Sequence, residues 1–531
     1  MPQANVSWKG ASFVKSLEAI PSSYDRYSDD SKILLVFLSF LSISDKIPPE
    51  LFFRGAVPCK RWSAEGNIED VDATHSDLSQ ELSSFLSDES RLHNSLDELR
   101  SSSAILDDSE GSYTLNEAMS GISKKLTAED LSFWRCQVLV AVYRAIPWKY
   151  IEYATIGTKL LLPHLKHILQ SFQSYSDRLS LNTRADLVLT LIEASRFPDM
   201  AWKKFAVGQA KVTSRALEDR YTEVCIAQAQ SLVHRIAGDV DRAVNSINLV
   251  QVRTSMDRRI HSAIGFLAVQ SSLNCIQVED LSTAEELLKD WKFLDEHPSL
   301  LERVVMFRKH AILGRILRFK GAFQESLEHL QKAQQIAAAH QQLIFDEDLC
   351  DLACDHADTL RELDEPVSAE QRLRVETTRQ RKNQIFNKSR LELALAEALF
   401  GQGRFKEAEE LCLAVQSRKG LLRFEKLRLQ ITMAKILHSK SDKERAFSYW
   451  SNAMEEIAKF RLTNGHTTRI IILSIRDTLS DVGQKRLREA SLEQDLVLYA
   501  TAKPGGTKYW IGGLGHWARL KGFSEIALLE D

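Results

Sequence analysis

The chain has 531 residues, of which 44% are hydrophobic and 27% are charged. Its 69 Lys and Arg are offset by 72 Asp and Glu, and this net charge of -3 excludes a polybasic protein held to nucleic acid by overall charge. With 22 Gly and 11 Pro, turn residues are too sparse for an all-β chain, so helix is the default expectation.

The longest apolar run spans residues 33–43, which is shorter than the roughly 20 residues that cross a bilayer. It also lies too far from Met1 to be part of a signal peptide. The seven Cys are odd in number and scattered, as in proteins with reduced, buried thiols. We therefore expect a cytoplasmic protein.

The composition and periodicity change along the chain and divide it into four regions. These regions are an N-terminal segment (1–30), a small module (31–126), a helical connector (127–180) and a long array of helical repeats (181–531).

The module is expected to begin with helices. A buried helix starts at Ser31, and Pro48 and Pro49 suit the first turn of a second one. A long amphipathic stretch follows, with apolar residues at three- and four-residue steps from Leu78 to Leu99.

The module ends in the one clear β signal of the sequence. Residues 104–106 and 113–115 flank a polar turn and predict a β-hairpin, which gives the order helix, helix, helix, hairpin of a winged helix. Residues 63–112 carry 13 Asp and Glu, against Arg91 and Arg100 as cations. Such a surface repels phosphate, so we expect a structural or interaction role rather than DNA binding.

The junction between this module and the array carries aromatic and titratable side chains, namely Trp148, Tyr150, His164 and His167. Junctions of this kind favour pockets. Packing in a core is the simpler interpretation, and a ligand pocket is the alternative.

The array has a period of about forty residues. Three turn glycines, Gly238, Gly321 and Gly403, are 83 and 82 residues apart, which is twice about 41. Small residues that start an apolar stripe recur at steps of 42, 41, 42, 43, 39 and 38: Ala201, Ala243, Ala284, Ser326, Ala369, Ala408 and Ala446. Weaker copies fall near Leu487 and Ala527, so we expect seven to nine helical hairpins stacked into a solenoid.

In each copy, a first helix such as 389–400 is followed by a turn and a second helix such as 405–415. A small residue is needed where the two helices cross closely, and Gly401 and Gly403 are expected to end the first helix. This pattern resembles tetratricopeptide repeats, although the period is longer than the usual 34 or so residues. The resemblance covers about residues 180–531 and implies an all-α solenoid fold.

The module together with the array resembles the winged-helix and repeat regions of STAND-type ATPases, especially fungal ones. Proteins of this family also need the nucleotide-binding motif GxxxxGK[ST], which this sequence lacks. The nearest stretch, residues 505–508, has the wrong order and is read as a loop. The resemblance therefore implies the sensor and arm of such a protein without its motor.

The array contains a local run of cations on one predicted helix: Arg372, Arg374, Arg379, Arg381 and Lys382. A solvated helix face is the simplest interpretation. If this stripe lined the concave surface of the solenoid, it would receive acidic residues of a protein partner.

Two further segments are unusual. His466 and Arg469 open an apolar helix whose N-terminal amides suit an anion, although capping alone explains the local sequence. The C-terminal stretch interleaves glycines with Trp510, His516 and Trp517, which suggests a cap or a lid over the repeats.

No catalytic motif, dinucleotide fingerprint or cofactor site is found. Cys350, Cys354 and His356 lack the second ligand pair of a zinc site and are read as core residues, so no metal is expected. We expect an adaptor or regulator that binds a protein partner on its concave face. The alternative is a helical-repeat enzyme or small-molecule sensor of a fungal specialised pathway, with His466, Arg469 or His516 in a pocket at the junction or under the C-terminal cap.

Overall fold

A computed structural model describes residues 26–108, 111–119, 121–171, 178–197, 199–215, 217–250, 257–380, 389–460, 465–479 and 506–523. The chain forms two compact units. The first comprises Met1–Val233 with Leu249–Ala263 and Ser299–Leu301, and the second comprises His234–Asn248, Ile264–Pro298 and Glu302–Asp531. The four regions expected from the sequence are defined by composition and periodicity rather than by compactness, and they stay predictions.

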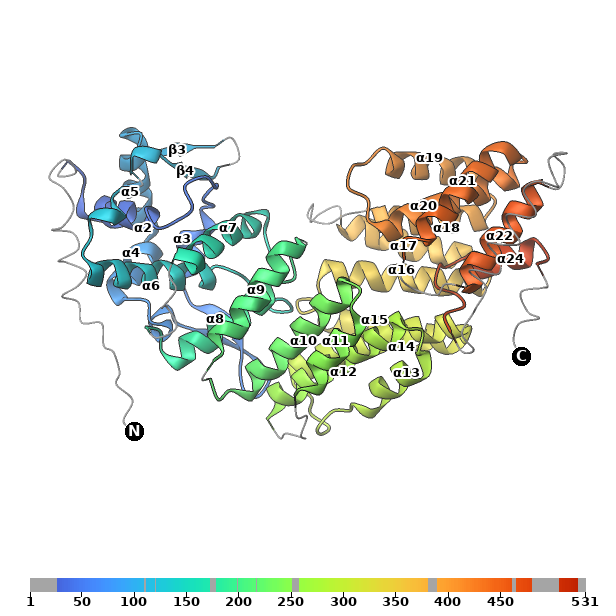
Figure 1. Ribbon diagram of the computed structural model, residues 1–531, viewed down its shortest axis with the longest axis horizontal. Coiled ribbons are helices and arrows are strands. Elements are labelled where there is room, and N and C mark those ends of the chain that lie inside the picture. Colours follow the sequence, from blue (N-terminus) through green and yellow to red (C-terminus); the bar gives the residue numbers. More distant parts are fainter. Residues whose placement is uncertain are drawn as a thin grey trace. The chain divides into compact units, whose positions relative to one another are not determined.

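The first unit begins with short helices and two small antiparallel sheets (Figure 1). In chain order these elements are α2 (Asp29–Leu38), α3 (Glu50–Ala56), β1 (Cys59–Trp62), β2 (Ile68–Val71), α4 (Gln80–Ser87), α5 (Glu89–Ser101), β3 (Ile105–Asp107) and β4 (Tyr113–Leu115). The longer helices α6 (Ala128–Arg144), α7 (Ile156–Ser171), α8 (Leu181–Ala194), α9 (Met200–Thr213) and α10 (Arg220–Ile236) follow.

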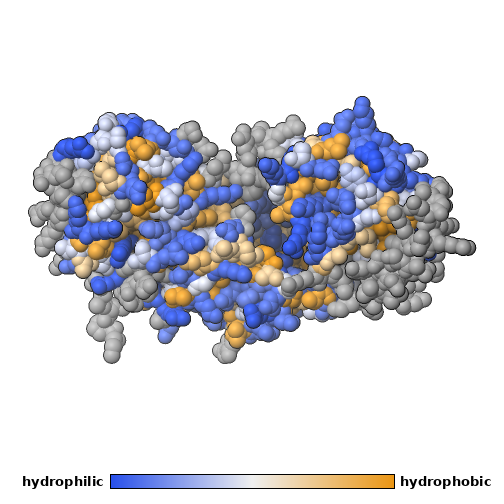
Figure 2. All heavy atoms as spheres, turned by 45° about the horizontal axis from the view of Figure 1, so that its top comes forward, coloured by the Kyte–Doolittle hydropathy of each residue, from blue (hydrophilic) through white to orange (hydrophobic). Residues whose placement is uncertain are grey.

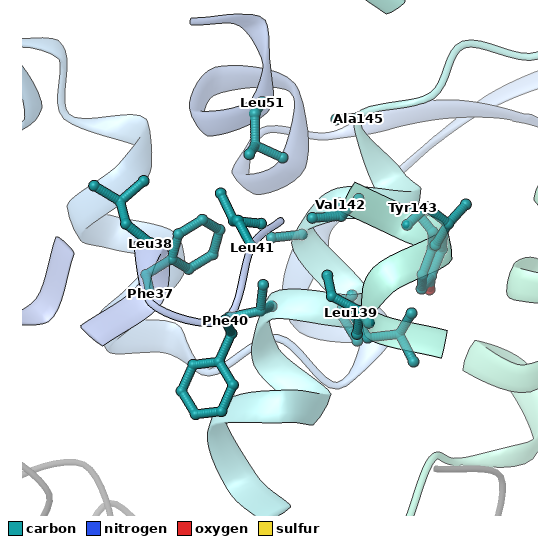
Figure 3. Packing of buried hydrophobic residues seen from close by; sticks show 14 of the residues in the cluster. Phe37, Leu38, Phe40, Leu41, Leu51, Leu139, Val142, Tyr143 and Ala145 are labelled. Carbon is teal, nitrogen blue, oxygen red and sulfur yellow. The ribbon is translucent and has the colours of Figure 1, made fainter. Parts of the chain in front are cut away.

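The core of this unit is formed where α2, α3 and α6 meet. The apolar run predicted as a buried helix supplies Phe37 and Leu41, which face Leu51 of α3 and Leu139 and Val142 of α6 (Figure 3). Each of these side chains is at most 1% exposed, and burial of such residues contributes about 1.5–3 kcal/mol apiece.

The predicted amphipathic stretch is broken into two helices at Asp88. The Asp88 side chain accepts from the backbone amides of Ser90 and Arg91 and so caps α5, which stops α4 from continuing. The apolar residues of both helices still share one buried face, including Leu82 and Leu99.

The predicted hairpin is confirmed as β3 and β4, which pair with Ile105 opposite Leu115. Ile47 extends this sheet by exchanging two backbone hydrogen bonds with Tyr113, at 2.7 and 2.9 Å.

A second hairpin was not expected. Strands β1 and β2 pair with Cys59 opposite Val71, and half of their side chains are charged, so that no alternating apolar pattern marks them in the sequence. Arg144 of α6 holds this hairpin in place, because its guanidinium donates to the carbonyls of Val57 and Val71. The expectation of a single hairpin is therefore wrong.

The second unit consists of paired antiparallel helices, drawn in green to red in Figure 1. Its first helices are α11 (Val240–Asn248), the larger part of α12 (Arg258–Gln277), α13 (Leu281–Asp290), the larger part of α14 (Leu300–Lys320) and α15 (Phe323–Ala339). They are followed by α16 (Asp346–Glu362), α17 (Pro366–Gln380), α18 (Ser389–Gly401), α19 (Phe405–Gln416), α20 (Arg423–Ser439), α21 (Lys443–Ile457), α22 (Gly465–Leu479) and α24 (Leu514–Leu520).

The recurring small residue occupies a fixed place in this architecture. It is the fourth residue of the second helix of every pair from α11 to α21, and it is fully buried: Ala243, Ala284, Ser326, Ala369, Ala408 and Ala446. Twelve residues before each of these six anchors, another small, buried residue is present: Ser231, Ser272, Gly314, Ala357, Ala396 and Ala434. The two helices cross where these positions meet, which confirms the predicted helical repeat.

Ala201 does not fit this pattern. It is exposed at the start of α9, and the fourth residue of that helix is Lys203. The Lys203 ammonium is buried and donates to the carbonyls of Ser195 and Arg196 at the end of α8, at 2.8 and 2.9 Å. The first copy of the repeat is thus anchored by a cation on a helix C-terminus rather than by a small side chain.

The turns between paired helices share one backbone feature. A residue with positive φ precedes each buried anchor by five positions; it is glycine at 238, 321 and 403 and another residue type at 279, 364 and 441. Gly403 has φ of +74°, as expected for the residue that ends α18. Gly401 instead allows α18 to approach α17 closely, because a Cβ there would lie 2.9 Å from Pro366 of α17.

The first helices of successive pairs, here called A helices, form one layer of the second unit. Within it, α16, α18 and α20 contact one another in succession. We call the surface formed by α14, α16, α18, α20 and α22 the A-helix face. No helix in the described part of the chain is long and apolar enough to cross a membrane.

Candidate functional site

Residues 506–523 lie along the A-helix face. The backbone amide of Lys508 donates to the carbonyl of Phe319 at the end of α14, and Lys521 reaches Asp477 of α22 at 2.9 Å. Ile511, Leu514 and Trp517 belong to the same buried cluster as the apolar residues of α16, α18 and α20. This segment therefore crosses the A helices and packs its apolar side chains against them. We call it the C-terminal segment.

Buried charged side chains of the A helices bind the backbone of this segment. Arg318 of α14 donates to the carbonyl of Tyr509 at 2.7 Å. Glu362 at the end of α16 accepts from the amides of Gly513 and His516 at 2.7 and 2.9 Å. Arg318 and Glu362 are at most 4% exposed. Hydrogen bonds to a charged partner contribute more than neutral ones, about 1.5–3 kcal/mol, so these contacts fix the path of the chain.

Three glycines allow the segment to approach the A helices this closely. A Cβ at Gly512 would lie 2.4 Å from the carboxyl carbon of Asp358, and one at Gly515 would lie 2.5 Å from Glu362. Gly513 adopts a left-handed backbone with φ of +80°, and a Cβ there would lie 2.8 Å from Arg361. No larger residue fits at any of the three positions without displacing a buried charged group.

A network of buried charges lies beneath the segment. Asp358 pairs with Arg361 and Arg428, and Arg361 also donates to Glu397 at 2.8 Å. Lys435 pairs with Glu397 from the next A helix. Groups removed from water this completely stay charged only when each has an opposite partner, and the network supplies one to each.

The pKa values of the carboxyl groups reflect this pairing. Burial alone raises the pKa of Asp358, but the guanidinium groups of Arg428 and Arg361 outweigh it and hold that pKa below its ordinary value. The same balance lowers the pKa of Glu397, where Lys435 and Arg361 oppose the effect of burial. Both groups are therefore carboxylates at neutral pH.

Aromatic side chains of the segment occupy separate positions on the face. The ring of Tyr509 meets Phe323 edge-on, with centroids 4.9 Å apart. Trp510 lies between Phe424 and Phe460, at 5.5 and 5.1 Å.

Trp517 is the most deeply buried of these rings. It packs against Phe400 and Trp450 and donates its indole N–H to the hydroxyl of Ser474 at 2.9 Å. Trp510 and Trp517, both expected near a pocket under the C-terminal cap, thus act as anchors of that cap.

The candidate catalytic residues take part in different contacts. His466 of α22 meets the ring of Tyr509 edge-on at 5.3 Å, whereas the His516 imidazole lies 2.6 Å from the carboxylate of Asp364. Arg469 is half-buried one turn further along α22. These contacts attach the C-terminal segment to the repeats and do not converge on one reacting position.

The aromatic side chains expected at the junction are buried. Trp148 donates to the hydroxyl of Thr190 at 2.9 Å and lies under the guanidinium of Arg61, 4.4 Å from its ring. Tyr150 is buried, with φ of +65°, and the Lys149 ammonium lies over its ring.

The histidines of that group contact a different part of the unit. His164 accepts from the amide of Ser42 at its Nδ1 and therefore donates from Nε2 to the carbonyl of Lys46, at 3.2 and 3.0 Å. Burial lowers the pKa of His164 and of His167. Trp148 thus packs toward α8 and β1, while His164 fixes the loop between α2 and α3.

The basic stripe lies on α17, which is the second helix of its pair and not part of the A-helix face. Arg374 pairs with Glu370, and Arg379 pairs with Glu376 and Asp346. Arg372 is half-buried, and Arg381 and Lys382 lie outside the described residues. Arg372, Arg374 and Arg379 thus lie on a second helix rather than on the A-helix face, and their binding of an acidic partner stays a prediction.

The buried charges were not identified from the sequence, although a signal was present. Glu397 and Lys435 each interrupt an apolar stretch, and they are 38 residues apart, the same step as between Ala408 and Ala446. Opposite charges one repeat apart within apolar helices indicate an ion pair between stacked A helices.

A small cavity with room for about one water molecule remains between the segment and the A helices, lined by Arg361, Pro366, Glu397, Phe400, Gly401, Gly513 and His516. On the face shown in Figure 2, hydrophobic residues are scattered among hydrophilic ones and form no broad apolar area. The A-helix face with its bound segment is thus the strongest candidate for a functional site.

Comparison with known proteins finds likeness in fold alone. No family model and no curated protein matches the sequence. Among solved structures, the chain is similar to a signal transduction ATPase with numerous domains (STAND) that has a tetratricopeptide repeat sensor, from Pyrococcus horikoshii, with 12% sequence identity and a TM-score of 0.48. The alignment covers 98% of this chain and 74% of that one. A likeness of this degree does not extend to activity or partners.

Proposed function

We propose that this chain is a cytoplasmic adaptor or regulator whose A-helix face binds an extended segment of a protein partner. The observation that carries this proposal is the recognition of a peptide backbone by side chains of the repeats: Arg318 binds the carbonyl of Tyr509, and Glu362 binds the amides of Gly513 and His516. Helical repeats commonly bind peptides in this manner, with stacked helices presenting side chains to an extended ligand.

The chain's own C-terminal segment occupies this face and is its internal ligand. An intramolecular ligand is favoured by its high effective concentration, so a partner binds only when it competes successfully with the segment or when the segment is released. This competition is what makes the role regulatory.

We infer that the front of the chain is a winged helix, formed by α2, α3, α5 and the β3–β4 hairpin, with a structural role. The two cations of residues 63–112 support this role, because Arg91 pairs with Asp30 and Arg100 with Asp97 and Asp107. Cations engaged in this way present little positive charge to a phosphate backbone. The combination of elements supports the resemblance to the sensor and arm of fungal STAND-type proteins.

A matched pair of glycine variants tests the proposal. Gly512→Ala places a methyl group 2.4 Å from Asp358, whereas Gly208→Ala on α9 meets nothing within 4 Å. Both proteins, tagged and isolated gently from their own host, would be cross-linked and analysed by native mass spectrometry. We expect a protein-sized mass increment that is greater for Gly512→Ala, with cross-links on α16, α18 or α20. Cross-links confined to other helices would show that the A-helix face is not the binding site.

A second candidate function is a small-molecule sensor, favoured by the cavity that His516 and Gly513 close over Arg361 and Glu397. The cavity has room for about one water molecule, so a metabolite would enter only if the segment shifts away from Arg361 and Glu397. In the same experiment this function predicts a metabolite-sized increment on the wild-type chain that is lost in His516→Ala, and its absence would count against the sensor.

A further inference from the structure

We propose that the partner segment has the chemistry of residues 506–523: a Gly-Gly-x-Gly core flanked by aromatic residues and followed by basic ones. This inference rests on the proposed function, since it specifies what the A-helix face accepts. It also implies that partner binding and release of the C-terminal segment are a single exchange reaction.

The glycine core follows from the positions of buried charges. Asp358, Arg361 and Glu362 lie within five consecutive positions near the end of α16, and each would meet a Cβ from the segment at less than 3 Å. Asp358 and Arg361 cannot move away without leaving their own ion partners, because Arg428 and Glu397 hold them from two other A helices. The backbone of any occupant must therefore approach as closely as glycine allows.

The aromatic flanks follow from the apolar positions on either side of the core. Before the core, Phe424 and Phe460 form a slot that holds an indole ring. After it, Phe400, Trp450 and the hydroxyl of Ser474 form a buried position that requires an apolar ring with one N–H donor. Tryptophan satisfies both demands, and buried aromatic anchors of this kind dominate binding energy in peptide interfaces.

The basic flank follows from acceptors at the edge of the face. The Asp364 carboxylate contacts the His516 imidazole, and the Asp477 carboxylate accepts a hydrogen bond from Lys521. The backbone carbonyl of Glu362 accepts a hydrogen bond from Arg519 at 2.8 Å. Complementary charges at an exposed edge increase the association rate and set direction more than they add affinity. The partner segment is thus basic after its glycine core, whereas the basic stripe of α17 suggested an acidic partner.

The test uses the full-length chain and, as probe, a fluorescein-labelled synthetic peptide of residues 506–523, with binding followed by fluorescence anisotropy. We expect Gly512→Ala in the chain to weaken its own segment and to increase the affinity for the probe at least tenfold over wild type. Gly208→Ala should bind the probe as wild type does. Hydrogen exchange of residues 506–523 in each chain shows directly whether the segment has been released.

Two altered probes separate the inference from the proposed function. A probe with alanine at the three glycine positions should lose binding by at least tenfold, and one with glutamate at positions 519 and 521 should bind more slowly at low salt. If the alanine probe binds as well as the original, the face binds peptides but the glycine requirement is wrong. If no probe binds a chain whose segment has been released, both the inference and the proposed function are wrong. Should Gly512→Ala fail to fold, Trp517→Ala releases the segment without placing an atom near Asp358.

Discussion

The side chain of Ser326 donates a hydrogen bond to the backbone carbonyl of Gly314, 2.7 Å away, at the point where α14 and α15 cross. The same relation recurs in the preceding pair with the partners exchanged, because Ser272 of α12 donates to the carbonyl of Ala284 of α13 at 2.9 Å. The crossing is thus a direct contact between one helix's side chain and the other's backbone. A small residue is required there for steric reasons.

Enlarging one of these residues should destabilise the repeat. We expect Ala284→Leu to lower the free energy of unfolding by about 1–3 kcal/mol, because extra methyl groups at a fully buried crossing force the helices apart. The same change at the exposed Ala201 should alter it by no more than about 0.5 kcal/mol. Urea denaturation of both variants checks this, and equal effects would show that the crossing does not need a small residue.

The buried ion network predicts strong coupling between Glu397 and Lys435. Lys435→Met leaves a buried carboxylate with one cation fewer, and loss of one member of such a pair lowers stability by about 3–5 kcal/mol. Adding Glu397→Gln should restore part of this loss, because the uncompensated charge is removed. A double-mutant cycle by urea denaturation measures the coupling energy, and additive effects would contradict the pairing.

Two arginines of α17 should behave differently although they lie on the same helix. Arg374 is mostly exposed and pairs with Glu370, so Arg374→Ala should change stability by at most about 1 kcal/mol. Arg379 neutralises Asp346 and Glu376, which are both buried, so Arg379→Ala should reduce stability by about 1–3 kcal/mol.

Neither of these variants should weaken binding of the peptide probe, since α17 is not part of the A-helix face. Thermal unfolding and fluorescence anisotropy, measured on the same two proteins, test both statements. A loss of probe binding in Arg374→Ala would show that the basic stripe is part of the binding site.

A pair of histidines predicts how stability depends on pH. The Nδ1 atoms of His310 and His329 lie 2.8 Å apart, so one ring donates to the other and the accepting nitrogen must be unprotonated. Burial, together with His329 and Lys309, lowers the pKa of His310 to about 4, and burial also lowers the pKa of His329. Unfolded histidine has a pKa of about 6.5.

The folded chain therefore binds fewer protons than the unfolded chain between pH 6.5 and about 4. The stability that the pair contributes is fully present above pH 6.5 and is lost as the pH falls through this window. Urea denaturation at pH 7, 5.5 and 4.5 should show this decline, with a smaller slope in His310→Asn. An unchanged slope in that variant would mean that other groups cause the decline.

The sequence predicted the repeat well because its signals are local. Period, turn positions and the anchors from Ala243 to Ala446 all depend on contacts between helices that follow one another directly. The misplacement of the first anchor at Ala201 has the same origin: alignment on small residues could not anticipate that Lys203 would occupy the equivalent place.

The candidate site could be predicted only in outline. The glycine and tryptophan content of the C-terminal segment indicated a cap, but its binding partners Arg318, Glu362 and Asp358 lie more than 145 residues earlier in the chain. Such contacts depend on how successive pairs stack, which a single sequence does not specify. The β1–β2 hairpin was missed for a related reason, since Arg61 and Trp62 become buried only through α8 and the residues near Trp148.

The C-terminal segment also changes how the second unit should respond to force. In an open solenoid each repeat contacts its neighbours alone, so pulling on the ends unravels the repeats one after another. Here a single stretch of chain ties Phe319 at the end of α14 to Asp477 on α22. The repeats between them are enclosed in a closed loop, and they should yield together in one cooperative rupture. Once a partner has replaced the segment, this connection is lost. The same repeats should then extend at lower force and unfold one after another.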